Sequence, residues 1–447
     1  MSTDSNSQPN QPDHPNGPIS FSTINDFFWD FVNDPVEGQI EEQIQAQIEA
    51  QQMSSHHRNK SRRHVDRNRE AAEKQLMDDY FSDNPRYNDK QFRRRFRMRR
   101  HLFHHIVQTL TDWSPQFRQR SDAFGKIGFS PLHKCTAAMR MLAYGTPADA
   151  LDENLRMGES TVLECLTYFC EGVMKNFGPD YLRRPKNEDI NRLLQIGEAR
   201  GFPGMLGSLD CMHWQWKNCP VEWQGAYTRG DQGAATIMLE AVASQDLWIW
   251  HAFFGTAGSN NDLNVLYQSP LFTEVVQGKA PEVQFMVNGN EYKLGYYLAD
   301  GIYPEWAAFV KTIPLPQSEK HKLFAQHQEG ARKDVERAFG VLQARFAIIR
   351  EPGRMWQKKT LAEIMYTCII LHNMIVEDER DSYEVRYDLD YEPGSYSIAL
   401  EGLEEGPIHG FDMVLEANAA IRDRPTHRRL KADLVEHIWQ KYGGNEA

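Results

Sequence analysis

The stretch LGSLDCMHWQW at residues 206–216 decides the fold of this chain, because it predicts the first strand of a sheet. The runs ATIMLEAVAS at 235–244 and LWIWHAFFG at 247–255 predict the second and third strands, and only Gln245 and Asp246 separate them. Tryptophans two residues apart in the first and third runs mark the faces of the sheet. The three segments therefore predict an antiparallel meander.

The segments after residue 260 supply helices and further strands. In order, we expect a helix from Asp262, a hairpin of VQFMVNG and YKLGYYLAD that turns at 288–290, a helix from Pro304, an apolar piece at 312–314, and helices over 328–345 and 360–378. This order predicts an α/β fold with a mixed sheet and helices on its faces. The meander and the absence of GxGxxG after a strand argue against a doubly wound dinucleotide-binding fold.

Charge is unevenly distributed along the chain. The 447 residues include 50 Lys and Arg against 62 Asp and Glu, a net charge of −12. Residues 1–57 contain nine acids and no Lys or Arg, residues 58–100 contain fifteen bases against seven acids, and residues 377–405 contain eleven acids against two Arg. A nucleic-acid partner needs a local basic surface, so the acidic total does not exclude one.

Four regions follow from these shifts in composition. We expect a disordered acidic leader at 1–57, a basic arm and helical DNA-binding domain at 58–200, a catalytic domain at 201–380, and an acidic linker with a C-terminal helix at 381–447. The apolar residues of the leader fit either a weakly helical tail or a docking helix for a partner. Scattered cysteines and the lack of an apolar run of about 20 residues predict a soluble intracellular protein without a membrane partner.

The basic arm ends in FRRRFRMRRHLF at 92–103, which interleaves arginines with apolar residues. Such a segment can dock as a helix while its guanidinium groups contact phosphates; a solvated charged face is the alternative. The predicted DNA contacts are Arg93, Arg94, Arg95, Arg97, Arg99, Arg100 and, in a later helix, Arg332. Downstream, short helices that end at Gly145 and Gly158 and a longer one with a capping box at Thr161 fit a helix-turn-helix or any small helical bundle.

Three acids are the candidates for chemistry. Asp210 lies on the first strand, Asp300 ends the strand YYLAD, and Glu336 lies beside the buried stripe of the helix ARKDVERAFGVLQARF. A rigid backbone holds acids at strand ends, and three convergent carboxylates without His or Cys match the oxygen ligands of Mg²⁺ or Mn²⁺. Two such ions can activate a water or a 3′-hydroxyl for in-line displacement at phosphorus. For each acid alone, a helix cap or a salt bridge is the alternative.

The segments GSLDCMHWQWKNCP, LADGIYPEW and RKDVERAFGVLQARF resemble the three catalytic blocks of DDE transposases of the PIF/Harbinger superfamily. FPGMLGSLDCMHWQW and EAVASQDLWIWHAFFGTAGSNNDLNVL are similar to the plant Ping/Pong type. The resemblance implies an RNase H-like core with Asp210, Asp300 and Glu336 as the metal-binding triad, and cut-and-paste transposition of double-stranded DNA in the nucleus. It also implies a Myb-like DNA-binding partner, and we expect a homo-oligomer found in the nucleus and cytoplasm.

Other interpretations stay open at this point. A domesticated, non-catalytic DNA- or chromatin-binding protein could retain the same fold, although all three triad positions are acidic here. Asp262 is a fourth candidate acid, and an N-cap formed by Asn261 or Asp262 is its alternative. His372 is interpreted as a core histidine, and the cysteines and histidine within 211–219 as core side chains, because they lack a regular zinc spacing.

Overall fold

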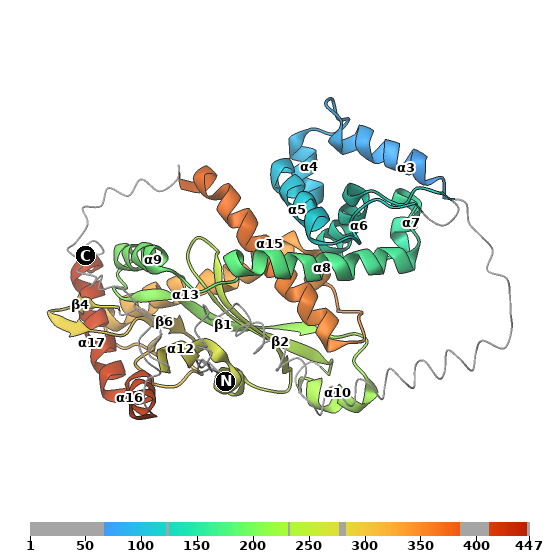
Figure 1. The fold of residues 1–447 in the computed structure, drawn as a ribbon. Helices are drawn as coiled ribbons and strands as arrows, with labels where there is room; N and C mark the ends of the chain where they lie inside the picture. Colours follow the sequence, from blue (N-terminus) through green and yellow to red (C-terminus); the bar gives the residue numbers. More distant parts are fainter. Residues whose placement is uncertain (1–66, 122–124, 231–232, 277–282, 385–410, 445–447) are drawn as a thin grey trace, which may run out of the picture. The chain divides into compact units, whose positions relative to one another are not determined.

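The computed structural model describes residues 67–444 except 122–124, 231–232, 277–282 and 385–410. The described residues belong to one compact unit, His64–Ala447, in which helices surround a mixed sheet (Figure 1). The predicted acidic leader and most of the acidic linker lie outside the described residues. Of the helices described, none combines the length and the apolar character needed to cross a membrane.

The central sheet has five strands in the order β3-β2-β1-β6-β7. β1 (Met205–Gln215), β2 (Thr236–Ala243) and β3 (Ile249–Ala257) pair antiparallel, which confirms the predicted meander. On the other side of β1, β6 (Tyr296–Ala299) pairs parallel to β1, and β7 (Phe309–Lys311) pairs parallel to β6. β1 therefore lies at the centre of the sheet, with an antiparallel neighbour on one edge and a parallel neighbour on the other.

The predicted downstream hairpin differs in its partners. β4 (Phe285–Val287) and β5 (Asn290–Tyr292) form a separate two-stranded sheet, and only the next strand, β6, joins the central sheet. Positive φ angles of 50° at Asn288 and 78° at Gly289 make the tight turn that the sequence predicts. The hairpin therefore extends from the sheet and does not widen it.

The helix predicted from Pro304 is wrong. Residues 301–308 form turns that lead directly into β7. Their N–H groups are used in short-range bonds that a helix would not make, such as Tyr303 N–H to the Asp300 carbonyl at 3.2 Å and Phe309 N–H to the Trp306 carbonyl at 3.0 Å. The apolar segment expected at 312–314 is not the strand itself. The strand here is β7, which ends at Lys311, just before that segment.

Helices cover both faces of the sheet. α13 (Glu319–Arg345) packs on β1, where the Ser208 hydroxyl donates to a backbone carbonyl of the helix at 3.0 Å. α11 (Asp262–Gln268) lies against the other face, in an apolar cluster that includes Leu209 of β1. Because side chains alternate along a strand, Asp210 shares the α13 face with Ser208.

The C-terminal helices are longer than the sequence pattern predicts. α13 begins nine residues before the expected start, because the Ser318 side chain accepts a hydrogen bond from the His321 N–H at 3.3 Å and caps the helix. α15 (Lys358–Glu384) contains the predicted helix at 360–378. After the undescribed linker, α16 (Phe411–Ile421) and α17 (Arg424–Tyr442) follow, and α17 packs on α13.

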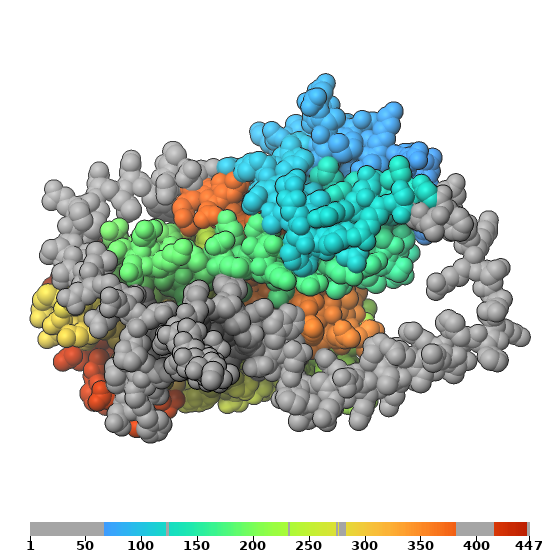
Figure 2. All heavy atoms as spheres, in the orientation of Figure 1, coloured from blue at the N-terminus to red at the C-terminus, as the bar shows by residue number. Residues whose placement is uncertain are grey.

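The helices before the sheet pack around aromatic side chains. In chain order they are α3 (Arg69–Leu76), the π-helical segment η1 (Met77–Phe81), α4 (Asp89–Phe96), α5 (Arg100–Trp113), α6 (Pro131–Tyr144), α7 (Ala150–Leu155), α8 (Glu159–Tyr181) and α9 (Asn187–Ala199). Phe92 and Phe96 of α4 are fully buried, with ring centres 4.2 Å apart, and Phe103 of α5 packs against both. The space-filling view shows the atoms of α4, α5 and α6 (cyan) packed against one another (Figure 2).

Capping residues account for the bounds of α6 but not for the start of α8. Ser130 accepts a hydrogen bond from the His133 N–H at 3.1 Å, and Gly145 ends α6 with a φ of 63°, as the sequence predicts. The capping box predicted at Thr161 is wrong. α8 begins at Glu159 after an extended Gly158, so Thr161 already lies inside the first turn.

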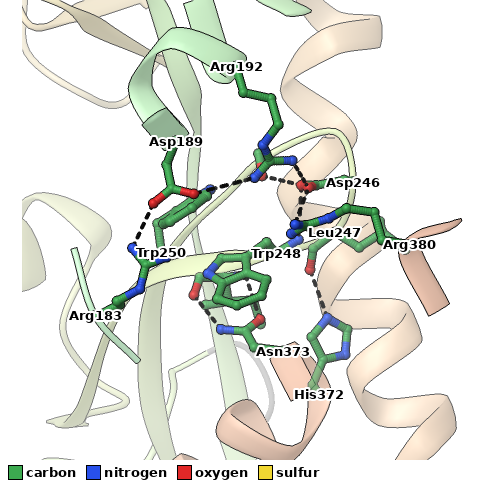
Figure 3. Close-up of polar contacts among 12 residues, drawn as sticks. Arg183, Asp189, Arg192, Asp246, Leu247, Trp248, Trp250, His372, Asn373 and Arg380 are labelled. Carbon is green, nitrogen blue, oxygen red and sulfur yellow. Dashed lines mark hydrogen bonds and ion pairs between the residues drawn. The ribbon is translucent and has the colours of Figure 1, made fainter. Parts of the chain in front are cut away.

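A polar network fastens the turn between β2 and β3 (Figure 3). The Asp246 carboxylate accepts hydrogen bonds from Arg192 of α9 and from the Ser244 hydroxyl, and it lies 3.8 Å from Arg380 of α15. Burial favours a higher pKa for Asp246, but Arg192, Ser244 and Arg380 together outweigh it and lower the pKa. The turn is thus tied to two helices by a carboxylate whose charge is fully matched.

His372 and Asn373 of α15 hold the same turn (Figure 3). His372 Nε2 donates to the Leu247 carbonyl at 2.8 Å, while Asn373 bonds to both the N–H and the carbonyl of Ile249, at 2.9 and 2.8 Å. Burial, together with the nearby Arg345, lowers the pKa of His372 to about 3. The ring is therefore neutral at physiological pH, and its interpretation as a core histidine is confirmed.

Candidate active site

Two of the three predicted acids meet on one face of the sheet. Asp210 of β1 points toward α13, which carries Glu336. Arg332, one helical turn before Glu336, donates to the Asp210 Oδ2 at 3.0 Å and lies 2.9 Å from the Glu336 Oε1. A single guanidinium group therefore joins carboxylates from a strand and a helix. Arg332, predicted as a DNA contact, faces the acids in this arrangement.

Asp210 is the more strongly held of the two acids. Its Oδ1 accepts a hydrogen bond from the Cys211 N–H at 2.8 Å, and its side chain is 18% exposed. The Glu336 side chain is 42% exposed and can be reached from solvent. The pair therefore combines a fixed carboxylate at the sheet with a more mobile one at the surface.

Asp300 lies beside this pair by virtue of the sheet register. In the parallel pairing of β1 with β6, Ser208 lies beside Leu298, so Asp210 and Asp300 occupy corresponding positions two residues further along. Asp300 directly follows the end of β6, is exposed, and accepts a hydrogen bond from the Gly301 N–H. The strand-end position predicted for this acid is confirmed, and its chemical role stays a prediction.

The fourth candidate, Asp262, is not the cap of its helix. The Asn261 side chain caps α11 by accepting from the Asn264 N–H at 2.9 Å. The Asp262 carboxylate instead bonds to the Cys211 thiol and lies close enough to Asp300 to interact with it electrostatically. Of the two cap interpretations, the one for Asn261 is correct, and Asp262 remains available to the acidic cluster.

The four acids outnumber the two arginines that interact with them, Arg332 and Arg229. Burial raises the pKa of Asp210 to about 6; the Cys211 N–H and Arg332 oppose the rise, and Asp262 and Glu336 add to it. Burial also raises the pKa of Asp262, and Asp300 adds to that rise. A set of carboxylates that raise one another's pKa in a partly buried site indicates a functional site.

The donor chemistry of the cluster suits a hard divalent ion. All its candidate ligands are carboxylate oxygens, which Mg²⁺ and Mn²⁺ prefer. Within the part of the chain that the structure describes, however, no three acidic, histidine or cysteine side chains lie close enough to hold a metal ion together. Arg332 occupies the place between Asp210 and Glu336 that a cation would take, so ion binding requires Arg332 to release a carboxylate.

A buried acid that the sequence interpretation missed lies behind the cluster. Glu240 of β2 is fully buried opposite Cys211 in the strand pairing, and its Oε1 lies 3.2 Å from the His251 Nε2. Cys211 also lies 3.6 Å from the Tyr303 hydroxyl. The signal was present in the sequence, because Glu240 is the single charged residue in the apolar run ATIMLEAVAS.

Most of the predicted DNA-contacting arginines have partners inside the protein, and three of them hold the region around the start of α5. Arg95 lies over the Tyr87 ring at 3.8 Å, Arg99 donates to the Asp378 carbonyl at 3.0 Å, and Arg100 donates to Asp89 at 3.1 Å. These contacts fix the short segment between α4 and α5 and its junction with α15.

Of the other arginines of this segment, Arg93 and Arg94 lie on α4, and Arg97 directly follows the helix with a φ of 64°. Arg93, Arg94 and Arg97 follow Lys90 at the spacing i, i+3, i+4 and i+7, and all four line a cleft of ≈ 400 Å³. The spacing could have been read from the sequence. The second wall of the cleft could not be predicted from the sequence, because α13, which is distant in the chain, supplies it.

Comparison with known proteins points to transposase-related proteins as the class. Residues 179–383 match a family model described as Plant transposon protein, a range that contains Asp210, Asp300 and Glu336. Residues 73–111, which span α4, match a model described as Domain of unknown function (DUF8418). No solved structure matches the chain at a significant level.

Two curated relatives agree with this class. The chain is 26% identical over 332 residues to "Protein ALP1-like" from Arabidopsis thaliana, which covers 70% of this chain and 78% of the relative. It is 21% identical over 281 residues to "Putative nuclease HARBI1" from Xenopus laevis, which covers 62% of this chain and 76% of the relative. These similarities support a Harbinger-related transposase family.

Proposed function

We propose that this chain is a DNA transposase of the PIF/Harbinger superfamily, of the plant Ping/Pong type, that cuts element ends and joins them to target DNA. The observation that carries the proposal is the surplus of carboxylates at the centre of the sheet: Asp262 and Glu336 interact with Asp210, and Asp300, just after β6, interacts with Asp262. The strand order, with an antiparallel and a parallel neighbour flanking β1, supports an RNase H-like core. Similarity to a plant transposon protein and to a nuclease supports the same class.

In this proposal the acids bind the metal, and Arg332 neutralises them before the metal binds. Asp210, Asp300 and Glu336 would hold the metal, with Asp262 beside them. When bound, two Mg²⁺ or Mn²⁺ ions supply positive charge that activates a water or a 3′-hydroxyl and stabilises the leaving oxygen. The chain itself fixes Asp210 through β1 and the Cys211 N–H. Arg332 neutralises the acids beforehand and, once released, can donate to a DNA phosphate.

The substrate and partners complete the proposal. The substrate is double-stranded DNA at the element's terminal repeats and at the target site, and the protein acts in the nucleus as a homo-oligomer. Its excess of positive charge is confined to residues 58–100, and contacts of basic side chains with phosphates carry no sequence information. Selection of the terminal repeat is therefore assigned to a Myb-like DNA-binding partner, as the family resemblance implies.

Loss of the acids tests the proposed chemistry. We expect Asp210→Asn, Asp300→Asn and Glu336→Gln each to lower Mg²⁺-dependent cutting of a duplex carrying the flanking inverted repeats by at least about 10³-fold, because each removes a ligand worth several kcal/mol. Glu329→Gln is the matched control, since Glu329 is an exposed acid on the same helix. If Asp300→Asn cut DNA at the wild-type rate, the role of second metal-binding acid would pass to Asp262. Cutting at the wild-type rate by all three variants would overturn the proposal.

One observation favours a second candidate function. Arg332 already bridges Asp210 and Glu336, an arrangement that is also compatible with a non-catalytic DNA- or chromatin-binding protein that retains the transposase fold. Such a protein would bind duplex DNA but would not cut it with Mg²⁺ or Mn²⁺. An Arg332→Gln variant that also fails to cut, although it binds DNA, would decide for this alternative.

A further inference from the structure

We propose that the cleft between α4 and α13 binds backbone phosphates of duplex DNA, and that the exposed face of α13 leads the duplex from there to Glu336. This inference rests on the proposed function, since Glu336 then marks the place of cutting. One wall of the cleft is a row of four cations: Lys90, Arg93 and Arg94 on α4 and Arg97 directly after it. The opposite wall is α13, with Val341, Ala344 and Arg345.

The cleft is strongly positive. Its lining contains five cationic side chains and one carboxylate, that of Glu379 on α15. Glu379 is 2% exposed and pairs with both Arg93, at 2.6 Å, and Arg345, at 3.4 Å. These two pairs orient the arginines on either wall but leave a surplus of positive charge between them.

The remaining cations lack acidic partners. Among the residues that the structure describes, no carboxylate pairs with Lys90, Arg94 or Arg97; the Arg97 guanidinium donates to two backbone carbonyls, at 3.0 and 3.1 Å. Cations one helical turn apart repel one another. A strand of DNA relieves this repulsion, because its phosphates recur along the row.

α13 leads from the cleft to the acids along a face with small side chains. Glu336, Gly340 and Ala344 follow one another in steps of four and so lie on one face. Glycine is unfavourable inside a helix, yet a Cβ added to Gly340 would meet no atom within 4 Å. The face of α13 at Gly340 is therefore open, and the missing side chain leaves room for a ligand to approach the helix backbone.

A charge-neutralising pair of substitutions tests the cleft. We expect Lys90→Gln with Arg94→Gln to reduce the slope of log affinity against log salt by about 2 for a 20-base-pair duplex of random sequence, because each lost phosphate contact contributes about 0.9. Lys322→Gln with Arg428→Gln is the control, as it removes the same charge from exposed positions elsewhere. An unchanged slope in the first variant would overturn the proposal.

A second pair of variants tests the path along α13. Gly340→Glu places a carboxylate on the proposed path and should weaken binding of the same duplex at least about tenfold. Gly330→Glu adds the same side chain to the same helix before Glu336, also where a Cβ meets no atom within 4 Å, and should leave binding unchanged. Thermal melting of both variants checks the fold. Equal weakening by both would overturn the path.

All binding is measured in EDTA, so that it does not depend on cutting. A protein that binds through the cleft but cuts no DNA with Mg²⁺ would overturn the transposase proposal and leave the cleft in place. Normal cutting with an unchanged salt slope in Lys90→Gln with Arg94→Gln would overturn the cleft alone. Phosphatidylserine vesicles serve as the competitor: displacement of the duplex from the wild type, but not from the variant, would reassign the cleft to a membrane surface and overturn the DNA proposal.

Discussion

Two aspartates in this protein are equally shielded from water and yet behave in opposite ways. The side chain of Asp210 in the acidic cluster is 18% exposed, and that of Asp246 at the β2–β3 turn is 21% exposed. Both pair with an arginine. Burial nevertheless raises the pKa of Asp210 to about 6, whereas the partners of Asp246 overcome burial and lower its pKa.

The neighbours of each carboxylate explain the difference. Asp246 is met by two arginines and a serine hydroxyl, so its charge is satisfied within the fold. Asp210 has one arginine, which Glu336 shares, and its other charged neighbours are acids. The turn is thus satisfied by its own partners, while the acidic cluster keeps an excess of negative charge. Such a contrast is the one expected between a structural carboxylate and a functional one.

The largest expected effect on stability comes from removing the charge of Asp246, which its neighbours satisfy. Asp246→Asn should destabilise the protein by about 3–5 kcal/mol at pH 7, because it leaves Arg192 and Arg380 partly buried without their counter-charge. Urea unfolding of the two proteins measures the difference. Since the pKa is lowered by folding, the wild-type advantage should be present above about pH 4 and shrink as the pH falls below it. Asp89→Asn, which alters an exposed ion pair with Arg100, should have little effect.

At the acidic cluster, removing a carboxylate charge is expected to stabilise the protein. Asp210→Asn should stabilise the metal-free protein by up to about 3 kcal/mol at pH 8, because a pKa raised to about 6 means that folding disfavours the charged carboxylate. Near pH 4 the wild-type carboxyl is largely protonated in the folded protein, and the two proteins should then be similar in stability. Urea unfolding in EDTA at the two pH values makes the measurement. A destabilised variant at pH 8 would show that Arg332 satisfies Asp210 as fully as Asp246 is satisfied.

The smallest expected effect on stability comes from substituting a glycine within a helix, and two such glycines can be compared. Gly340→Ala on α13 should stabilise the protein by about 1 kcal/mol, because the added methyl group meets nothing and alanine is the better helix former. Gly197→Ala on α9, the helix that also carries Arg192, should destabilise it, since its Cβ would lie 2.8 Å from the Phe202 carbonyl oxygen. Thermal melting would report both. Destabilisation by Gly340→Ala would mean that the glycine serves the helix itself.

Local patterns in the sequence predicted much of the fold. The meander, the helix end at Gly145 and the strand-end position of Asp300 depend on alternation, capping and turn residues that are close together in the chain. The turns at 301–308 and the earlier starts of α8 and α13 were missed, because Gly158 and Ser318 give weaker local signals than the residues chosen.

The site was harder to predict than the elements that build it. The sequence identified Asp210 and Glu336 as candidates but did not predict that Arg332 contacts both of them. The predicted DNA contact of Arg332 stays a prediction. The contact of Arg332 with Asp210 depends on how α13 packs on β1, and no spacing along the chain encodes it. The division of the basic arm into inward and cleft-lining arginines has the same origin, since Tyr87, Asp378 and Glu379 decide which side chains face inward.

The length of α13 sets a distance within the molecule. From Glu336 to Arg345 the helix advances nine residues, or about 13.5 Å at 1.5 Å per residue, close to the axial length of four base pairs at about 3.4 Å each. A continuous helix packed along the sheet works as a ruler, because it can neither stretch nor shorten between these two residues. Under the proposed function, a duplex held in the cleft at one end of this ruler would present one narrow window of its length to the acids at the other end. The protein would then set the distance between the held phosphates and the cut.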